Sequence, residues 1–329
     1  MRRARTTTAA LALAVALSVG ACSTPLPEPE PDAVPASAVP VTSPEHAEDV
    51  VGRVLEALAA SDESGTMEPV AGRIGGVAER MRTGQLVLAG AGIASNPTSV
   101  PTDVQTLVVP TDPQWPRTML AVSEPPADLT PPVLVALVQQ RARDPYRLAA
   151  WARLFPGTTL PATAQPSVGT PAPPPDEELL VPREEVLARY IDVVVNGDAS
   201  PHAATFPADP VRSGLAETRA TFTAAADAGT GTFSETHTPV EGSGLSVATA
   251  DGGAIVLSTF ESAFTLQLQE SSITVSSPAI VAYLGTPTLR TSITVTQLTT
   301  VAVHVPPAGS TDPLRALGGD TTTVGASGS

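Results

Sequence analysis

Two runs of sequence decide the fold: residues 254–269, AIVLSTFESAFTLQLQ, and residues 289–305, LRTSITVTQLTTVAVHV. Both alternate apolar and polar side chains, which is typical of strands with one buried face. In the first run the apolar face holds Val256, Phe260, Phe264, Leu266 and Leu268. In the second it holds Ile293, Val295, Val301, Val303 and Val305, and the other face holds Thr294, Thr296, Thr300 and His304. We therefore expect antiparallel sheet with one packed face and one solvated face.

Outward from these runs, each half of the chain is expected to contain helices followed by strands. In the first half we expect helices over residues 44–60 and within 67–82, then strands over 85–93, 104–109, 117–122, 133–141 and 147–155. In the second half we expect helices over 183–195 and 210–228, then strands over 230–238, 244–250, 254–269, 273–281 and 289–305. This repeated order predicts an α+β fold.

Proline-rich segments predict the domain boundaries. Residues 22–44 hold Cys22 and a run of alternating prolines, which favours an extended linker that cannot bury a core. A second proline-rich stretch, residues 156–182, separates two halves of similar size. We expect two compact helix-plus-antiparallel-sheet domains, 45–155 and 183–305, and a flexible Gly-, Ser- and Thr-rich tail over 306–329.

The first 22 residues, MRRARTTTAALALAVALSVGAC, have the pattern of a secretory leader: early arginines, a short apolar run, then small residues. Val19-Gly20-Ala21-Cys22 resembles a bacterial lipobox. That resemblance implies cleavage after residue 21, a diacylglycerol on the Cys22 thiol and acylation of the new terminus. It predicts a lipoprotein on the extracytoplasmic face of the cell membrane. The alternatives are an ordinary secreted protein with a chance cysteine, and twin-arginine export through Arg2-Arg3.

Composition excludes several kinds of chemistry. All 18 basic residues are arginine, which excludes a Schiff-base lysine, a P-loop lysine and a Ser-x-x-Lys site. Cys22 is the single cysteine, which excludes an intrachain disulfide and a cysteine-based zinc site. The net charge of −15 argues against a nucleic-acid surface. Since hydrolase, zinc and EF-hand motifs are absent from the sequence, we expect no metal and no cofactor.

The C-terminal half, residues 183–305, carries a resemblance to NTF2-like, cone-shaped domains. Ala188-Arg189-Tyr190-Ile191, then Asn196-Gly197-Asp198, Phe206 and Ala208-Asp209-Pro210, are similar to the helix, break and second helix that open such domains. The whole chain also resembles uncharacterised actinobacterial cell-envelope lipoproteins. NTF2-like domains include both enzymes and binding modules, so the resemblance implies a fold and no single activity.

Two groups of residues are candidate sites. Tyr190, His202 and Asp209, with Asp198 nearby, could form an acid/base cluster in a cone-shaped pocket, or a polar loop and a helix cap. The second group is a basic patch with aromatic residues, which could bind an acidic partner or form a solvated hairpin face. It comprises Arg141, Arg143, Tyr146, Arg147, Trp151 and Arg153.

These observations favour a lipid-anchored, extracytoplasmic binding or envelope-assembly protein without catalytic activity. Its expected partners are the membrane, through Cys22, and an envelope protein, and not nucleic acid. One alternative is a small-molecule hydrolase or isomerase, which needs Tyr190, His202 and Asp209 together in an enclosed pocket. The other is a solute-binding lipoprotein of a transporter, which needs one cleft between the two halves.

Overall fold

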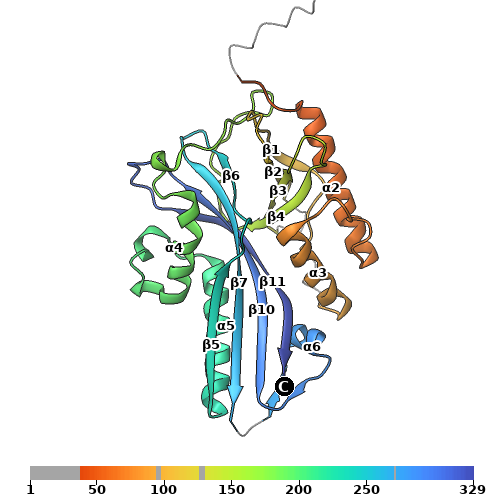
Figure 1. The fold of residues 1–329 in the computed structure, drawn as a ribbon, viewed down its shortest axis with the longest axis vertical. Coiled ribbons are helices and arrows are strands. Elements are labelled where there is room, and N and C mark those ends of the chain that lie inside the picture. The colour runs from red at the N-terminus through yellow and green to blue at the C-terminus, as the bar shows by residue number, and fades with distance from the viewer. Residues whose placement is uncertain (1–37, 94–97, 126–129, 270–271) are drawn as a thin grey trace, which may run out of the picture. The chain divides into compact units, whose positions relative to one another are not determined.

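A nine-stranded antiparallel sheet runs through the computed structural model, which describes residues 38–329 except 94–97, 126–129 and 270–271 (Figure 1). The strand order is β1-β2-β3-β4-β11-β10-β7-β5, and β6 also pairs with β7. The strands are β1 (Val104–Val108), β2 (Arg117–Ser123), β3 (Val133–Gln139), β4 (Arg147–Leu154), β5 (Gly231–Pro239), β6 (Leu245–Ala248), β7 (Ala254–Leu268), β10 (Ser292–Val305) and β11 (Arg315–Gly328). The predicted leader and Cys22 lie outside the described residues.

Helices combine with a large antiparallel sheet, so the predicted α+β class is confirmed. The α-helices are α2 (Pro44–Ser64), α3 (Gly76–Gly90), α4 (Arg183–Asn196), α5 (Pro210–Ala228) and α6 (Pro278–Leu284). A small second sheet pairs β8 (Ile273–Thr274) with β9 (Thr288–Leu289). None of the helices in the described part of the chain is long and apolar enough to span a membrane.

The last strands of the two halves, β4 and β11, pair with each other and join the halves into one sheet. The seam is short: Leu154 pairs with Gly318 and Arg153 pairs with Gly319. Glycine is needed there, because a Cβ on Gly318 would lie 2.3 Å from the carbonyl oxygen of Arg153. Residues 38–329 therefore form one compact unit, and the expectation of two separate domains is wrong.

The proline-rich segment 156–182 is an ordered connection that is bonded to both halves. The Thr170 amide donates to the Val109 carbonyl at 2.7 Å, and the Thr111 amide donates to the Thr170 carbonyl at 2.8 Å. Further along, the Leu180 amide donates to the Pro306 carbonyl at 2.9 Å. These bonds hold the segment to the end of β1 and to the end of β10, so it does not behave as an independent linker.

The expected flexible tail, residues 306–329, is also corrected. Most of it is β11, which pairs with β10 along its length. Its Gly- and Thr-rich sequence concealed this strand, because alternation of apolar and polar residues is weak there. The small residues fit close neighbours: a Cβ on Gly319 would lie 2.5 Å from a Val211 methyl, and one on Gly328 would lie 2.4 Å from the Ser292 carbonyl oxygen.

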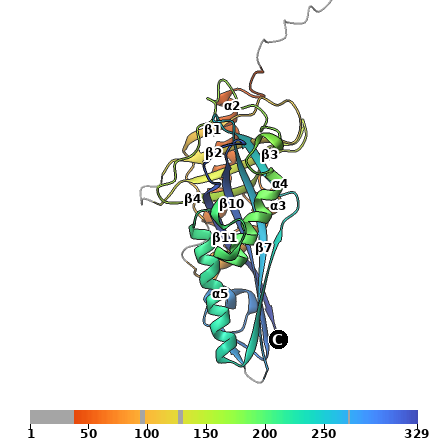
Figure 2. The ribbon, with the colours of Figure 1, turned by 90° about the vertical axis from the view of Figure 1, so that its left-hand side faces the viewer.

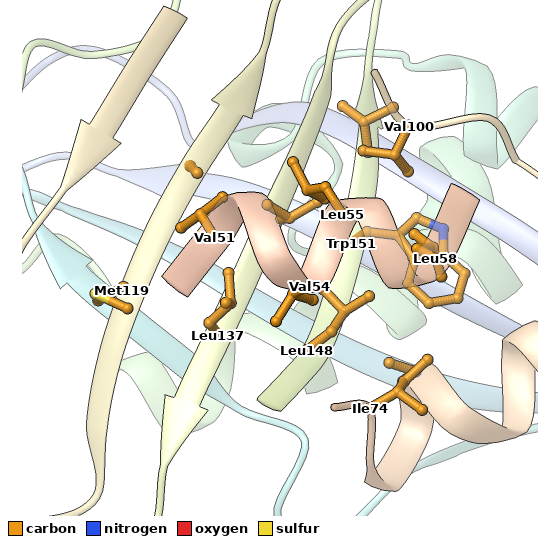
Figure 3. Packing of buried hydrophobic residues seen from close by; sticks show 14 of the residues in the cluster. Val51, Val54, Leu55, Leu58, Ile74, Val100, Met119, Leu137, Leu148 and Trp151 are labelled. Atoms are coloured by element: carbon orange, nitrogen blue, oxygen red, sulfur yellow. The ribbon is translucent and has the colours of Figure 1, made fainter. Parts of the chain in front are cut away.

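Three apolar cores explain why the halves do not separate. The first packs α2 and α3 against β1–β4, and Figure 3 shows Val51, Leu55 and Trp151 within it. The second packs α4 and α5 against β7 and β10. The third joins the other face of β1–β4 to β6, β7, β10 and β11, and it contains Leu134, Ala152, Val247, Leu257, Ala302 and Leu317.

The strands β5, β7, β10 and β11 reach beyond β1–β4, and α6 packs against β11 in this extension (Figures 1 and 2). A fourth apolar cluster fills it, with Leu266, Ile293 and Val295 from the sheet and Ala226 from α5. The strand expected over 273–281 is wrong, because Pro278 opens α6 after only two strand residues.

Two other expectations, both about residues that α3 forms or contacts, also fail. Residues 85–93 were expected to form a strand, but α3 continues to Gly90 and buries Gln85, Leu86 and Leu88. The second face of β10 was expected to be solvated, yet Thr300 and His304 are buried. Met81 of α3 lies over Thr300, with 3.4 Å between the sulfur and the hydroxyl oxygen.

Candidate functional site: a cationic pocket beside the β3–β4 hairpin

The first candidate cluster is a buried helix cap. The Tyr190 hydroxyl, from α4, donates to Asp209 Oδ1 at 2.9 Å, and the Arg212 amide donates to the same oxygen at 3.0 Å. Asp209 is the N-cap of α5, and Tyr190 is fully buried. Burial raises the pKa of Asp209, and burial with the Asp209 charge raises the pKa of Tyr190 far above its ordinary value. The pair holds α4 to α5.

His202 does not join this cap in the described structure. It precedes a short 3₁₀ turn, residues 203–205, and its backbone amide donates to Ser200 Oγ at 3.0 Å. Asp198 lies exposed on the preceding turn. Tyr190, His202 and Asp209 line none of the three cavities that are described below. The structure therefore does not bring the expected acid/base cluster together.

A serine–histidine–glutamate arrangement on β5 and β7, which the sequence reading missed, is also structural. His237 Nδ1 lies 2.8 Å from Ser262 Oγ, and His237 Nε2 lies 3.8 Å from Glu235 Oε2. Ser262 is fully buried and the His237 side chain is 1 % exposed, so no substrate reaches the hydroxyl. Burial lowers the pKa of His237, which favours its neutral form in this packed site.

The expected basic patch divides into three environments. Trp151 is fully buried: its indole donates to Asp320 Oδ2 at 2.7 Å, and Arg82 lies over its ring at 5.3 Å. Arg153 lies at the seam, where its guanidinium donates to the Pro131 carbonyl at 3.2 Å. Arg141, Arg143 and Arg147 remain exposed around the turn between β3 and β4, with Tyr146 half-buried among them. We call Arg141, Arg143 and Arg147 the hairpin arginines.

A cavity of about 400 Å³ opens beside this turn, and we call it the cationic pocket. Its charged and polar lining comes from separate elements: Arg53 from α2, Arg73 from the turn before α3, Arg117 from the start of β2, and Asp144 and Tyr146 from the hairpin. Val41, Thr42 and His46 line its remaining side. Three arginines therefore face one space that contains a single carboxylate.

The pocket arginines have few internal partners. Arg53 lies 4.0 Å from Asp49, an exposed pair that contributes little. Arg117 stacks on Trp115 at 4.1 Å and donates to the Pro113 carbonyl at 3.0 Å. Among the described residues, neither Arg73 nor Arg117 lies within ion-pair distance of a carboxylate.

Two buried polar atoms at this pocket have no hydrogen-bond partner: Arg117 Nε and the Tyr146 hydroxyl. A buried polar group left unpaired costs about 1–3 kcal/mol, so such atoms are uncommon without a functional reason. Burial raises the pKa of Tyr146, against the opposing charge of Arg117, so the hydroxyl keeps its proton and remains a donor. The site is rich in donors and short of acceptors.

A second cavity, of about 470 Å³, lies on the other side of the hairpin turn. Arg80 and Arg147 line it, but Arg80 is already paired with Glu261 at 2.5 Å and Glu241 also lines the wall. Asp144 and Pro145 belong to both cavities. The positive and negative side chains that line the second cavity are therefore more nearly balanced than those of the cationic pocket.

A third cavity, of about 450 Å³, lies at the seam and is lined by both halves of the chain. Phe155, Val211 and Leu215 give it an apolar wall, and Arg153 and Gln297 are its principal polar groups. Gln297 Oε1 is buried without a hydrogen-bond partner. Both this cavity and the second one are lined by residues from the two halves of the chain.

No group of three or more His, Cys, Asp or Glu side chains within the described residues could hold a metal ion. Comparison with known families finds one match: the model described as "Domain of unknown function (DUF8094)" matches residues 38–328. No curated protein matches the chain. No solved structure matches it either. The residues of the chain itself are therefore the basis for any functional argument.

Proposed function

The chain belongs to the DUF8094 family, and from its own residues we propose that it is a lipid-anchored, extracytoplasmic binding protein that acts without catalysis. In this proposal Cys22 carries the anchor, and the hairpin arginines form the surface that an acidic envelope partner contacts. The observation that carries the proposal is the concentration of arginines around the β3–β4 turn of an otherwise acidic chain.

The charge distribution supports an anionic partner. Fifteen arginines follow Cys22, and seven of them lie around the β3–β4 turn or line the two cavities beside it: Arg53, Arg73, Arg80, Arg117, Arg141, Arg143 and Arg147. The whole chain carries a net charge of −15. A local positive surface on an acidic protein attracts and orients an acidic partner while the remaining surface repels it.

The leader sequence supports the anchor. Residues 1–22 fit a lipoprotein leader, and the following proline-rich residues suit an extended tether. Labelling cells with radioactive palmitate tests this directly. The wild-type protein is expected to take up the label and Cys22→Ser is expected to lose it; a labelled Cys22→Ser protein would contradict the anchor.

Site-specific photo-cross-linking in the native cells tests the partner surface. A photoreactive amino acid replaces Arg143, and the same amino acid at Arg290, an exposed arginine outside the hairpin and both cavities beside it, provides the control. We expect a discrete adduct with an acidic protein at position 143 and none at 290. Arg141→Gln with Arg147→Gln should weaken the adduct. Identical patterns at both positions, or no adduct at 143, would overturn the proposal.

A second candidate function, solute binding, is favoured by one observation, the third cavity, at the seam between β4 and β11. The solute-binding alternative requires a cleft between the two halves, and this cavity is lined by both; its walls suit an apolar or amphiphilic molecule. Native mass spectrometry of the gently purified lipoprotein tests it. A discrete extra mass that Gly214→Trp removes would support a solute in this cavity, and a bare protein mass would exclude it.

A further inference from the structure

The lining of the cationic pocket holds more positive than negative side chains. Three lining arginines, Arg53, Arg73 and Arg117, face one lining carboxylate, Asp144. These four side chains together carry a net charge of about +2, and the exposed Asp49 carboxylate lies 4.0 Å from Arg53 at the edge of the pocket. A bound carboxylate would offset half of that charge, whereas a phosphate monoester, with about −1.5 to −2 at neutral pH, offsets nearly all of it.

The donors of the pocket match the acceptors of a phosphate. Guanidinium groups bind phosphate oxygens through paired N–H donors, and Arg73 and Arg117 keep such donors free of carboxylates within the described residues. Arg117 Nε and the Tyr146 hydroxyl lack acceptors altogether. Both atoms are buried, so an anion in the pocket reaches them only if the two side chains turn toward it.

The size of the pocket indicates more than a bare ion. A volume of about 400 Å³ falls within the range of small-molecule sites, so it has room for an organic group attached to the phosphate. Val50 and Val54 of α2 also line the pocket and offer apolar contact to such a group.

We propose that the cationic pocket is a binding site for a phosphate monoester, held by Arg73 and Arg117, with Tyr146 as an additional donor. The phosphate belongs either to a soluble phosphorylated compound or to a lipid headgroup, since the recognising chemistry is the same. This site uses residues other than the hairpin arginines, so it does not rest on the protein partner proposed above.

Isothermal titration calorimetry with glycerol 3-phosphate tests the site in the full-length lipoprotein, in a neutral detergent and a phosphate-free buffer. We expect saturable binding with one site per chain, and binding of glycerate, the carboxylate analogue, at least tenfold weaker. Arg73→Gln should weaken binding about tenfold or more, and Arg290→Gln should leave it unchanged. No saturable binding, or equal binding of glycerate, overturns the proposal.

Arg117 also packs on Trp115, so its replacement could disturb folding. Tyr146→Phe removes only the unpaired hydroxyl and provides the second test. It should keep the thermal midpoint of the wild type and weaken glycerol 3-phosphate binding several-fold. Unchanged affinity in both Arg73→Gln and Tyr146→Phe would place the phosphate elsewhere and overturn the assignment.

Nanodiscs distinguish the two sources of the phosphate. The anchored protein is titrated with glycerol 3-phosphate in phosphatidylcholine discs with and without phosphatidic acid. Weaker apparent affinity in the phosphatidic acid discs, absent in Arg73→Gln, assigns the site to a headgroup. Equal affinity in both discs assigns it to a soluble ligand. A positive cross-link at position 143 without any phosphate binding would leave the protein partner standing and reject this site alone.

Discussion

At the scale of single residues, the same side chains fit different roles once their surroundings are known. Tyr190 and Asp209 are close, as an acid/base cluster would require, but the carboxylate caps α5 and both groups are buried. Trp151 anchors the first core through Asp320 and Arg82. The sequence analysis identified Tyr190, Asp209 and Trp151 as candidate site residues, but it could not tell buried polar contacts from exposed ones.

The N-cap of α5, Asp209, predicts different losses of stability for two substitutions. Asp209→Ala removes the acceptor for both the Arg212 amide and the Tyr190 hydroxyl, and we expect it to lower the free energy of unfolding by about 1–3 kcal/mol. Asp209→Asn keeps an acceptor oxygen and should cost clearly less. Urea denaturation measures both. Equal losses for the two variants would contradict the capping role.

Burial of Asp209 also predicts a dependence on pH. Because the pKa of Asp209 is raised in the folded protein, the folded state binds the carboxyl proton of Asp209 more tightly than the unfolded state does. The associated stability is present below the unfolded pKa, near pH 4, and is lost as the pH rises through the folded pKa. The stability difference between wild type and Asp209→Asn should therefore fall as pH rises through this window; a constant difference would contradict it.

At the scale of elements, alternation and helical spacing predicted most strands and helices to within a few residues. The helix expected over 210–228 matches α5, and the strand expected over 254–269 matches β7. Local patterns do not show which strands pair with each other. Nothing in residues 147–155 or 306–329 marks them as neighbours, because partners so far apart are chosen by packing and not by local propensity.

The cationic pocket was missed for the same reason. The sequence indicated the hairpin from Arg141 to Arg153, but Arg53, Arg73 and Arg117 lie on three other segments and meet Tyr146 only in the folded chain. Its clearest signal in the sequence was the absence of an acidic neighbour beside Arg117.

The seam between β4 and β11 predicts a sharp contrast between two glycines of one strand. In Gly318→Ala the new Cβ would lie 2.3 Å from a backbone oxygen of β4, so the strands must separate and we expect a loss above about 2 kcal/mol. Gly325→Ala is the matched control, since its nearest atom would be 3.9 Å away. It should change stability by no more than about 0.5 kcal/mol. Similar thermal midpoints for both variants would contradict the close seam.

At the scale of the molecule, the two halves depend on each other. Each contributes side chains to the third core, and the proline-rich connection between them is bonded to both. Folding by halves is therefore not expected, although each half opens with two long helices that strands follow. The apolar pattern of the halves predicted most of their helices and strands, but it wrongly predicted that the halves are independent domains.

Removing β11 tests this dependence. A chain that stops at Val305 loses the strand between β4 and β10, as well as the Asp320 acceptor of Trp151. We expect tryptophan fluorescence to shift to the red and cooperative unfolding to disappear, even though both tryptophans lie in the first half. A truncated chain with native fluorescence and a cooperative transition would show that the first half folds alone.

The central position of β11 also sets the order in which the protein can be completed. While residues 315–328 are missing from a growing chain, β4 and β10 each present unpaired backbone groups, which are open to pairing with other chains. The seam then joins residues 154 and 318, a contact between distant parts of the chain of the kind that slows folding. The interval before that closure is when newly made protein most needs protection from aggregation.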